Sequence, residues 1–123
     1  MSGSKLLVDT NIVLYFLKGN DELTRLFSDY ALAVSFISEL ELLSFGQISP
    51  EDDKAIRSLL KFVQIIDITP EIKSQTVSIR RKSKLKLPDA IIAATSLSQD
   101  LPFITADVGF SKIKDPRIIL YEL

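Results

Sequence analysis

The sequence predicts an α/β fold, a three-layer sandwich in which helices flank a mainly parallel central sheet of about five strands. Two observations predict this class. Short continuous apolar runs alternate along the chain with segments of helical periodicity, as in sheets whose strands are buried on both faces. In addition, 123 residues with 46% hydrophobic content suffice for one core but not for two domains of ordinary size. We therefore expect residues 1–123 to form a single domain.

Five apolar or β-branched runs predict the strands. They cover residues 6–8, 33–36, 63–66, 103–105 and 118–120. Ligands of such sheets bind beyond the carboxyl ends of the strands, near the point where the strand order reverses. Acidic residues that follow a strand are therefore the first candidates for a functional site.

Helices are predicted between these strands. Apolar residues recur at three- and four-residue spacing around 23–30 and 55–63, which favours helices with one buried face. Ser49 and Thr69 each precede a proline and acidic residues, a pattern typical of a capped helix start. Residues 88–97 have almost no polar stripe, so we expect a central helix that is covered on most sides.

The composition excludes several kinds of chemistry. The chain has no cysteine and no histidine, which rules out disulfides, thiolate catalysis, Ser-His-Asp triads and zinc sites with nitrogen or sulfur ligands. Oxygen ligands remain, and clusters of Asp and Glu suit hard cations such as Mg²⁺ or Mn²⁺. The net charge of −1 means that a nucleic-acid partner would need a local basic patch.

The length of the apolar runs indicates whether the chain could insert into a membrane. All are far shorter than the roughly 20 residues of a membrane-spanning helix, and no signal-peptide pattern precedes the first strand. We expect a cytoplasmic protein that does not insert into membranes.

Four acidic residues stand where predicted strands end or predicted helices begin. They are Asp9, Glu41, Asp89 and Asp107. Carboxylates gathered at one edge of a sheet would repel one another and raise each other's pKa values unless a divalent cation offset their charge. A cation held there could activate water for attack on a phosphodiester. We expect Asn11 and Thr105 to orient ligands or water beside it.

Each acid also has a structural explanation. Asp9 could cap a helix that begins near residue 12, and Glu41 could form a capping box with Ser38. Asp89 could interact with the dipole of the helix that it opens, and Asp107 could be a turn residue. The convergence of all four favours a shared metal site over these separate roles.

Four motifs resemble those of the PIN domain. In chain order they are Val8-Asp9-Thr10-Asn11, Ser38-x-x-Glu41-Leu42, Leu87-Pro88-Asp89-Ala90-Ile91-Ile92-Ala93-Ala94-Thr95 and Thr105-Ala106-Asp107. The resemblance spans nearly the whole chain and is greatest to VapC-type toxins of type II toxin–antitoxin systems. It implies a PIN-like fold, an Mg²⁺- or Mn²⁺-dependent endoribonuclease, an RNA substrate, a homodimer and a protein antitoxin.

The resemblance also chooses between two neighbouring glutamates. Glu39 and Glu41 lie on different faces of a helix, so only one is expected to reach a shared site. In the family the acid precedes a leucine and follows a Ser or Thr by three residues, which assigns the role to Glu41. The chain departs from the family pattern at 83–87, where many relatives have a glycine, and at 108–109, where many have another acid.

A basic run precedes the third acid. It consists of Arg80, Arg81, Lys82, Lys84 and Lys86, five positive charges in seven residues. The structural explanation is a solvated helix end. We expect instead a contact with the RNA backbone, or a docking place for an antitoxin tail, since positive charge draws in phosphate that carboxylates would repel.

Other families fit less well. A response-regulator receiver domain would use Asp67, but it needs two acids after the first strand and a lysine after the last. A haloacid-dehalogenase-type phosphatase needs an aspartate where this chain has Asn11. The remaining alternative is a catalytically inactive PIN-like scaffold that binds RNA or a protein partner, because a fold alone does not establish an activity.

Overall fold

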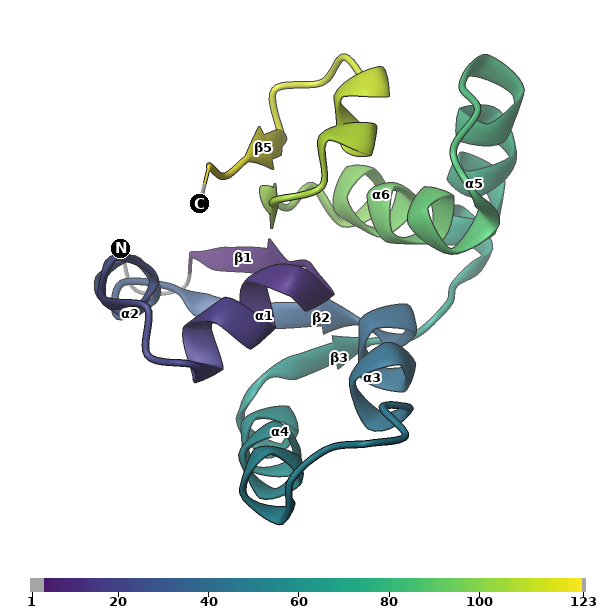
Figure 1. The fold of residues 1–123 in the computed structure, drawn as a ribbon. Coiled ribbons are helices and arrows are strands. Elements are labelled where there is room, and N and C mark those ends of the chain that lie inside the picture. Colours follow the sequence, from purple (N-terminus) through teal and green to yellow (C-terminus); the bar gives the residue numbers. More distant parts are fainter. Residues whose placement is uncertain (1–3, 123) are drawn as a thin grey trace.

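The computed structural model describes residues 4–122 (Figure 1). In chain order the elements are β1 (Lys5–Val8), α1 (Thr10–Leu17), α2 (Asp21–Phe27), β2 (Ala31–Ser35), α3 (Phe36–Leu43), α4 (Pro50–Phe62), β3 (Gln64–Ile66), α5 (Pro70–Lys82), α6 (Leu87–Gln99), β4 (Phe103–Thr105), the 3₁₀ helix η1 (Val108–Lys112) and β5 (Ile118–Leu120). Strands and helices alternate over most of the chain, which confirms the predicted α/β class. Within the described residues, no helix combines the length and the apolar character needed to cross a membrane.

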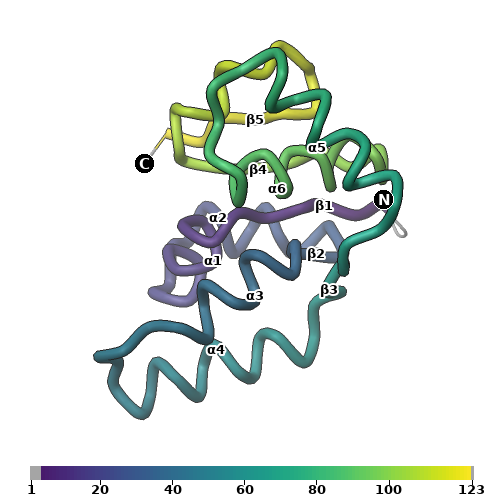
Figure 2. Tube along the Cα trace, turned by 90° about the vertical axis from the view of Figure 1, so that its right-hand side faces the viewer, coloured from purple at the N-terminus to yellow at the C-terminus, as the bar shows by residue number. Residues whose placement is uncertain are grey.

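The five strands form one sheet in the order β3-β2-β1-β4-β5, which Figure 2 shows from bottom to top. Every neighbouring pair is parallel, with Leu7 opposite Ala33 of β2 and Phe103 of β4. The chain builds outward from β1 to β3 on one side and then returns to add β4 and β5 on the other. The order therefore reverses between β1 and β4, and their carboxyl ends form the crevice where α/β sheets bind ligands.

Two apolar cores lie on opposite faces of the sheet. Alternate residues of β1 point to opposite faces, so Leu6 and Val8 enter one core and Leu7 enters the other. The first core includes buried residues of α1 to α4, and the second includes those of α5, α6 and η1. This arrangement confirms the three-layer sandwich.

Helix α6 is the buried central helix that its composition predicts. Its covered positions are Ala90, Ile92, Ala93, Ala94, Thr95 and Ser96. Small residues here let the helix approach the sheet and α5 closely. The helix begins at the carboxyl edge of the sheet, so its first turn lies near the crevice between β1 and β4.

Local capping explains most of the element boundaries. The hydroxyls of Ser49 and Thr69 each accept a backbone N–H three residues later, at 3.1 Å, as the sequence predicts for helix starts. Ser35 caps α3 by accepting the N–H of Ile37, so Phe36 begins that helix and does not extend β2 as expected. Val63 likewise ends α4, and β3 begins one residue later than expected.

Candidate active site

Two of the four acidic residues follow neighbouring strands and lie at the crevice between the carboxyl ends of β1 and β4. Asp9 directly follows β1, and Asp107 lies two residues beyond β4. Glu41 comes from the last turn of α3 and Asp89 from the first turn of α6. The charges of Glu41 and Asp89 both act on Asp9. Asp89 also feels the charge of Asp107, so the fold brings all four carboxylates into one electrostatic cluster.

Asp9 is the buried member of this cluster, with only 6% of its surface exposed. The backbone N–H of Thr10 donates to its Oδ1 at 2.9 Å, and the hydroxyl of Thr105 donates to its Oδ2 at 2.5 Å. Burial raises the pKa of Asp9 to about 6, and the negative charges of Glu41 and Asp89 add to the rise, while both hydrogen bonds oppose it. A cation near this carboxylate would relieve the same electrostatic cost.

The capping role suggested for Asp9 is also present. Asp9 is the N-cap residue of α1, which begins at Thr10 and so starts two residues earlier than expected. One oxygen serves the helix and the other is held by Thr105. Each carboxylate oxygen has a further lone pair, so capping leaves Asp9 able to bind a cation.

The capping box suggested for Glu41 is wrong. Helix α3 already begins at Phe36 because Ser35 caps it, and this places Ser38 and Glu41 inside the helix. The hydroxyl of Thr10 instead donates to Oε1 of Glu41 at 2.6 Å. The contact with Thr10 directs the Glu41 side chain toward the exit of β1.

The charge of Glu39 does not act on the acids of the site as that of Glu41 does. Among the charges that raise the pKa values of Asp9 and Asp89, Glu41 contributes and Glu39 does not. Two residues along a helix correspond to a rotation of about 200°, so the two side chains point to different sides. The geometry therefore agrees with the choice of Glu41.

Asp89 and Asp107 occupy the open side of the cluster. Burial raises the pKa of Asp89, as do the charges of Asp107 and Glu41, while Lys86 lowers it. Asp107 is exposed and caps η1 by accepting the N–H of Gly109 at 2.8 Å. A Cβ at position 109 would lie 3.1 Å from Oδ1 of Asp107, so glycine allows this close turn. The structural roles of Asp89 and Asp107 are thus compatible with a shared site.

Thr105 and Asn11 occupy different positions around the acids. Thr105 donates to Asp9 and accepts the N–H of Asp107 at 3.0 Å, so one buried hydroxyl joins two members of the cluster. Asn11 accepts the N–H of Ala106 at 3.2 Å and fixes the segment that leaves β4. Sequence reasoning missed Thr10, although its place directly after Asp9 could have drawn attention to it.

The donor set fits a hard cation. The side chains that meet here offer carboxylate oxygens, and they repel one another in the absence of a positive charge. Within residues 4–122 no three acidic side chains already surround a common point closely enough to form a complete ligand set. Glu41 and Asp107 are exposed, and their side chains have rotamer freedom to adjust toward a cation.

The five cations of the basic run have different surroundings. Arg80 donates from Nη1 to the carbonyl of Leu85 at 2.9 Å and so braces the connection between α5 and α6. Lys86 precedes α6, and its charge acts on Asp89. Arg81, Lys82 and Lys84 lie between these two, and all five residues are exposed. In the described part of the chain none of the five has an acidic side chain within 4 Å.

Comparisons with known proteins agree with this architecture. The PIN domain family matches residues 6–116. A toxin–antitoxin complex from Klebsiella pneumoniae contains a chain of 31% identity with a TM-score of 0.80, over 96% of this chain and 99% of that one. None of the curated proteins matches the sequence.

Two further structures share the fold at 20% identity. VapBC2 from Rickettsia felis bound to a promoter DNA fragment has a TM-score of 0.80, over 95% of this chain and 97% of that one. DNA-bound VapBC from Salmonella typhimurium also has a TM-score of 0.80, over 96% and 97%. The chain therefore belongs to the PIN domain family, and its resemblance to the VapC-type toxins of that family is confirmed.

Proposed function

We propose that this protein is a divalent-metal-dependent endoribonuclease that acts as the toxin of a toxin–antitoxin pair. The observation that carries the proposal is the position of Asp9, a buried carboxylate that faces the charges of Glu41 and Asp89 at the crevice between β1 and β4. The cation would be Mg²⁺ or Mn²⁺, held by Asp9, Glu41, Asp89 and Asp107. Such a site offers a nuclease both an anchored cation and access for a phosphate.

Different residues would have different roles in the reaction. When bound, the cation would activate a water molecule and stabilise the negative charge that develops on the phosphodiester. Thr105 and the Thr10 N–H hold the Asp9 carboxylate in one orientation, and the Thr10 hydroxyl holds Glu41. Asp9 would hold the metal in its ionised form, because ligands bind deprotonated. The exposed Asp107 would complete the ligand set from the open side.

The partners follow from the family and from its structures. The Klebsiella pneumoniae relative is part of a toxin–antitoxin complex, which supports a protein antitoxin for this chain as well. The RNA substrate and the homodimer are expectations from the PIN family resemblance, and a cytoplasmic location is an expectation from the sequence pattern.

Cleavage of RNA by the purified protein tests the proposal. We expect cleavage in Mg²⁺ or Mn²⁺, loss of cleavage in EDTA and recovery when the metal is returned. Asp9→Asn should reduce the rate by at least about a hundredfold, since it removes a charged ligand. Asp29→Asn is a matched control, because Asp29 is an exposed aspartate between α2 and β2. Equal cleavage by wild type and a folded Asp9→Asn variant would contradict the mechanism.

The same experiment separates an enzyme from an inactive scaffold. A scaffold would bind RNA with the same affinity in EDTA and in Mn²⁺ and would release no fragments. The uncompensated repulsion around Asp9 argues against a scaffold, which gains nothing from burying a carboxylate beside two others.

A further inference from the structure

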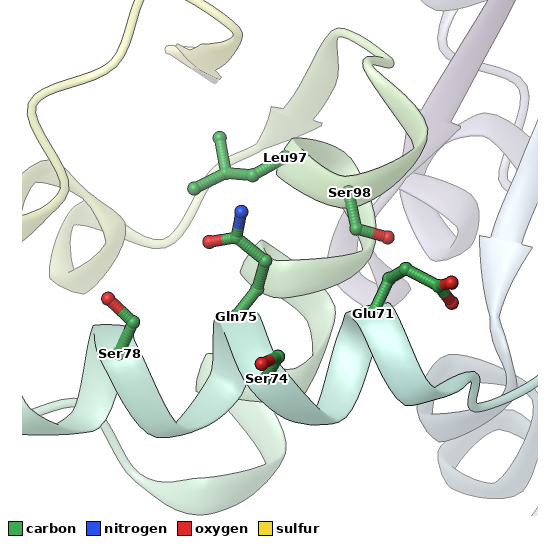
Figure 3. A pocket seen from close by; sticks show the side chains of 6 residues that line it. All are labelled: Glu71, Ser74, Gln75, Ser78, Leu97 and Ser98. Atoms are coloured by element: carbon green, nitrogen blue, oxygen red, sulfur yellow. The ribbon is translucent and has the colours of Figure 1, made fainter.

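A polar trough lies between α5 and the segments that pack beside it. One part has a volume of about 500 Å³ and is lined by Glu71, Ser74, Gln75, Ser78, Leu97 and Ser98 (Figure 3). A second part, of about 270 Å³, shares Gln75, Ser78 and Leu97 with the first. The two parts are therefore continuous along one side of α5.

The second part of the trough has three lysines at its walls. Lys82 comes from the end of α5, Lys112 from the end of η1 and Lys114 from the loop that follows. We call the part that they line the lysine groove. All three side chains belong to exposed residues, and within residues 4–122 none lies within 4 Å of an acidic group. Two segments far apart in the sequence thus bring positive charge to one hollow of the surface.

The one acid that lines the lysine groove is already paired. Arg117 donates to Asp115 from Nε at 2.9 Å and from Nη2 at 3.0 Å. These hydrogen bonds hold the pKa of Asp115 at about 2, so the carboxylate stays ionised beside its arginine. The excess charge of the groove therefore comes from its three lysines.

Two short segments of chain connect the lysine groove with the acidic cluster. Along η1, Lys112 lies five residues after Asp107, which corresponds to about 10 Å at the 3₁₀ rise of about 2 Å per residue. On the other wall, the loop after Lys82 leads to Lys86, whose charge acts on Asp89. A strand bound at the carboxylates can thus reach the groove within a short length.

We propose that the lysine groove binds the phosphate backbone of the RNA next to the cleaved bond. This inference rests on the proposed function and adds a second point of contact for the substrate. Lysine side chains neutralise phosphates without reading the sequence. The trough that continues from the groove is lined mainly by the hydroxyl and amide side chains of Ser74, Gln75, Ser78 and Ser98, which can hydrogen-bond a hydrated sugar–phosphate chain. Leu97 and the acidic Glu71 complete the lining, and Glu71 lies at the end of the trough away from Lys82.

Binding of RNA without cleavage tests the groove. The full chain is titrated into a fluorescein-labelled, 12-nucleotide single-stranded RNA in EDTA at several NaCl concentrations, and anisotropy gives Kd. We expect Lys112→Gln/Lys114→Gln to raise Kd about 5- to 25-fold at 0.1 M salt. The slope of log K against log salt should fall by roughly 1.4, since each single-strand phosphate contact contributes about 0.7.

A double variant on another helix provides the control. Lys54→Gln/Lys61→Gln removes two exposed lysines of α4 and the same net charge, and it should leave Kd and the slope near those of wild type. Equal RNA affinity for wild type and Lys112→Gln/Lys114→Gln would overturn the proposal. So would an equal loss in both double variants, because net charge and not the groove would then set the affinity.

A labelled oligoglutamate peptide serves as a second probe. Loss of peptide binding with unchanged RNA binding would identify the groove as a dock for an acidic protein segment and would overturn the RNA proposal. Because these titrations contain no free divalent metal, they do not depend on cleavage. Failure of the nuclease proposal would appear only in the cleavage experiment.

Discussion

The hydroxyl of Thr105 donates a hydrogen bond to Oδ2 of Asp9 at 2.5 Å, although 96 positions separate the two residues in the sequence. The contact joins the carboxyl ends of β4 and β1, and the same hydroxyl accepts the N–H of Asp107. Thr105 is fully buried, so its hydrogen bonds have no competing water. It therefore fixes the one acid of the cluster that is itself buried.

Replacing Thr105 with valine should weaken metal binding more than it weakens the fold. The change keeps the shape but leaves the buried Asp9 with one donor fewer, at a cost of about 1–3 kcal/mol in unfolding free energy. We expect Mn²⁺ affinity, measured by calorimetry, to fall about tenfold or more, with a similar loss of cleavage rate. Thr105→Ser keeps the hydroxyl and should retain most of the affinity. Equal affinities in the valine and serine variants would contradict this role.

The two neighbouring glutamates of α3 should differ in their effect on activity. Glu41→Gln removes a charge that acts on Asp9 and Asp89, so cleavage should fall at least about tenfold. Glu39→Gln makes the same chemical change two residues away and should keep activity within about twofold. Initial rates on one RNA at saturating Mn²⁺ measure both. If Glu39→Gln were the more damaging change, the assignment of Glu41 would be wrong.

Substitution of the two adjacent arginines at the end of α5 should have different effects on the free energy of unfolding, although each removes one positive charge. Arg80 bonds to the carbonyl of Leu85, so Arg80→Gln should lower the free energy of unfolding by about 1 kcal/mol. Both arginines are exposed, but within the described residues Arg81 donates no such hydrogen bond, so Arg81→Gln should change the free energy of unfolding by less than about 0.5 kcal/mol. Urea unfolding followed by circular dichroism makes the comparison. Similar urea midpoints for the two variants would show that the hydrogen bond between Arg80 and Leu85 does not contribute to stability.

The pair formed by Asp115 and Arg117 should stabilise the fold in a pH-dependent way. The hydrogen bonds that Arg117 donates to Asp115 lower the pKa of this carboxyl from 3.8 to about 2. A carboxyl whose folded pKa is lowered stabilises the fold above its unfolded pKa, and this stabilisation disappears as the pH falls toward the folded value. Asp115→Asn should therefore be less stable than wild type at pH 5 to 7, with a difference that shrinks between pH 4 and pH 2. Chemical unfolding at each pH measures it, and a difference independent of pH would count against the charged pair.

Local sequence was enough to predict most of the helices and strands and which of their faces are buried. The short apolar runs, the capping hydroxyls of Ser49 and Thr69 and the apolar helix over 88–97 each depend on neighbours within a few residues. The positions of Asp9 and Asp107 after strands also follow from local pattern. Once the sheet is parallel, these two acids must leave it at the same edge.

Competing local signals explain what the sequence left undecided. Ser35 and Ser38 are both suitable N-caps, and only the folded structure shows that Ser35 takes the role and that Glu41 lies in the last turn of the helix. In the same way, the basic run looked uniform along the chain, yet Arg80 is engaged by a backbone carbonyl while Lys82 lines a groove.

The sequence by itself determined the α/β class, the helices and strands and the acidic residues at their ends, because hydrophobic period and capping act over a few residues. Only the tertiary structure decided that β4 pairs with β1, that Thr105 reaches Asp9, and that Lys112 and Lys114 join Lys82. These contacts depend on which strands and helices pack together. That choice minimises the exposed apolar surface of the whole chain, so no short segment encodes it.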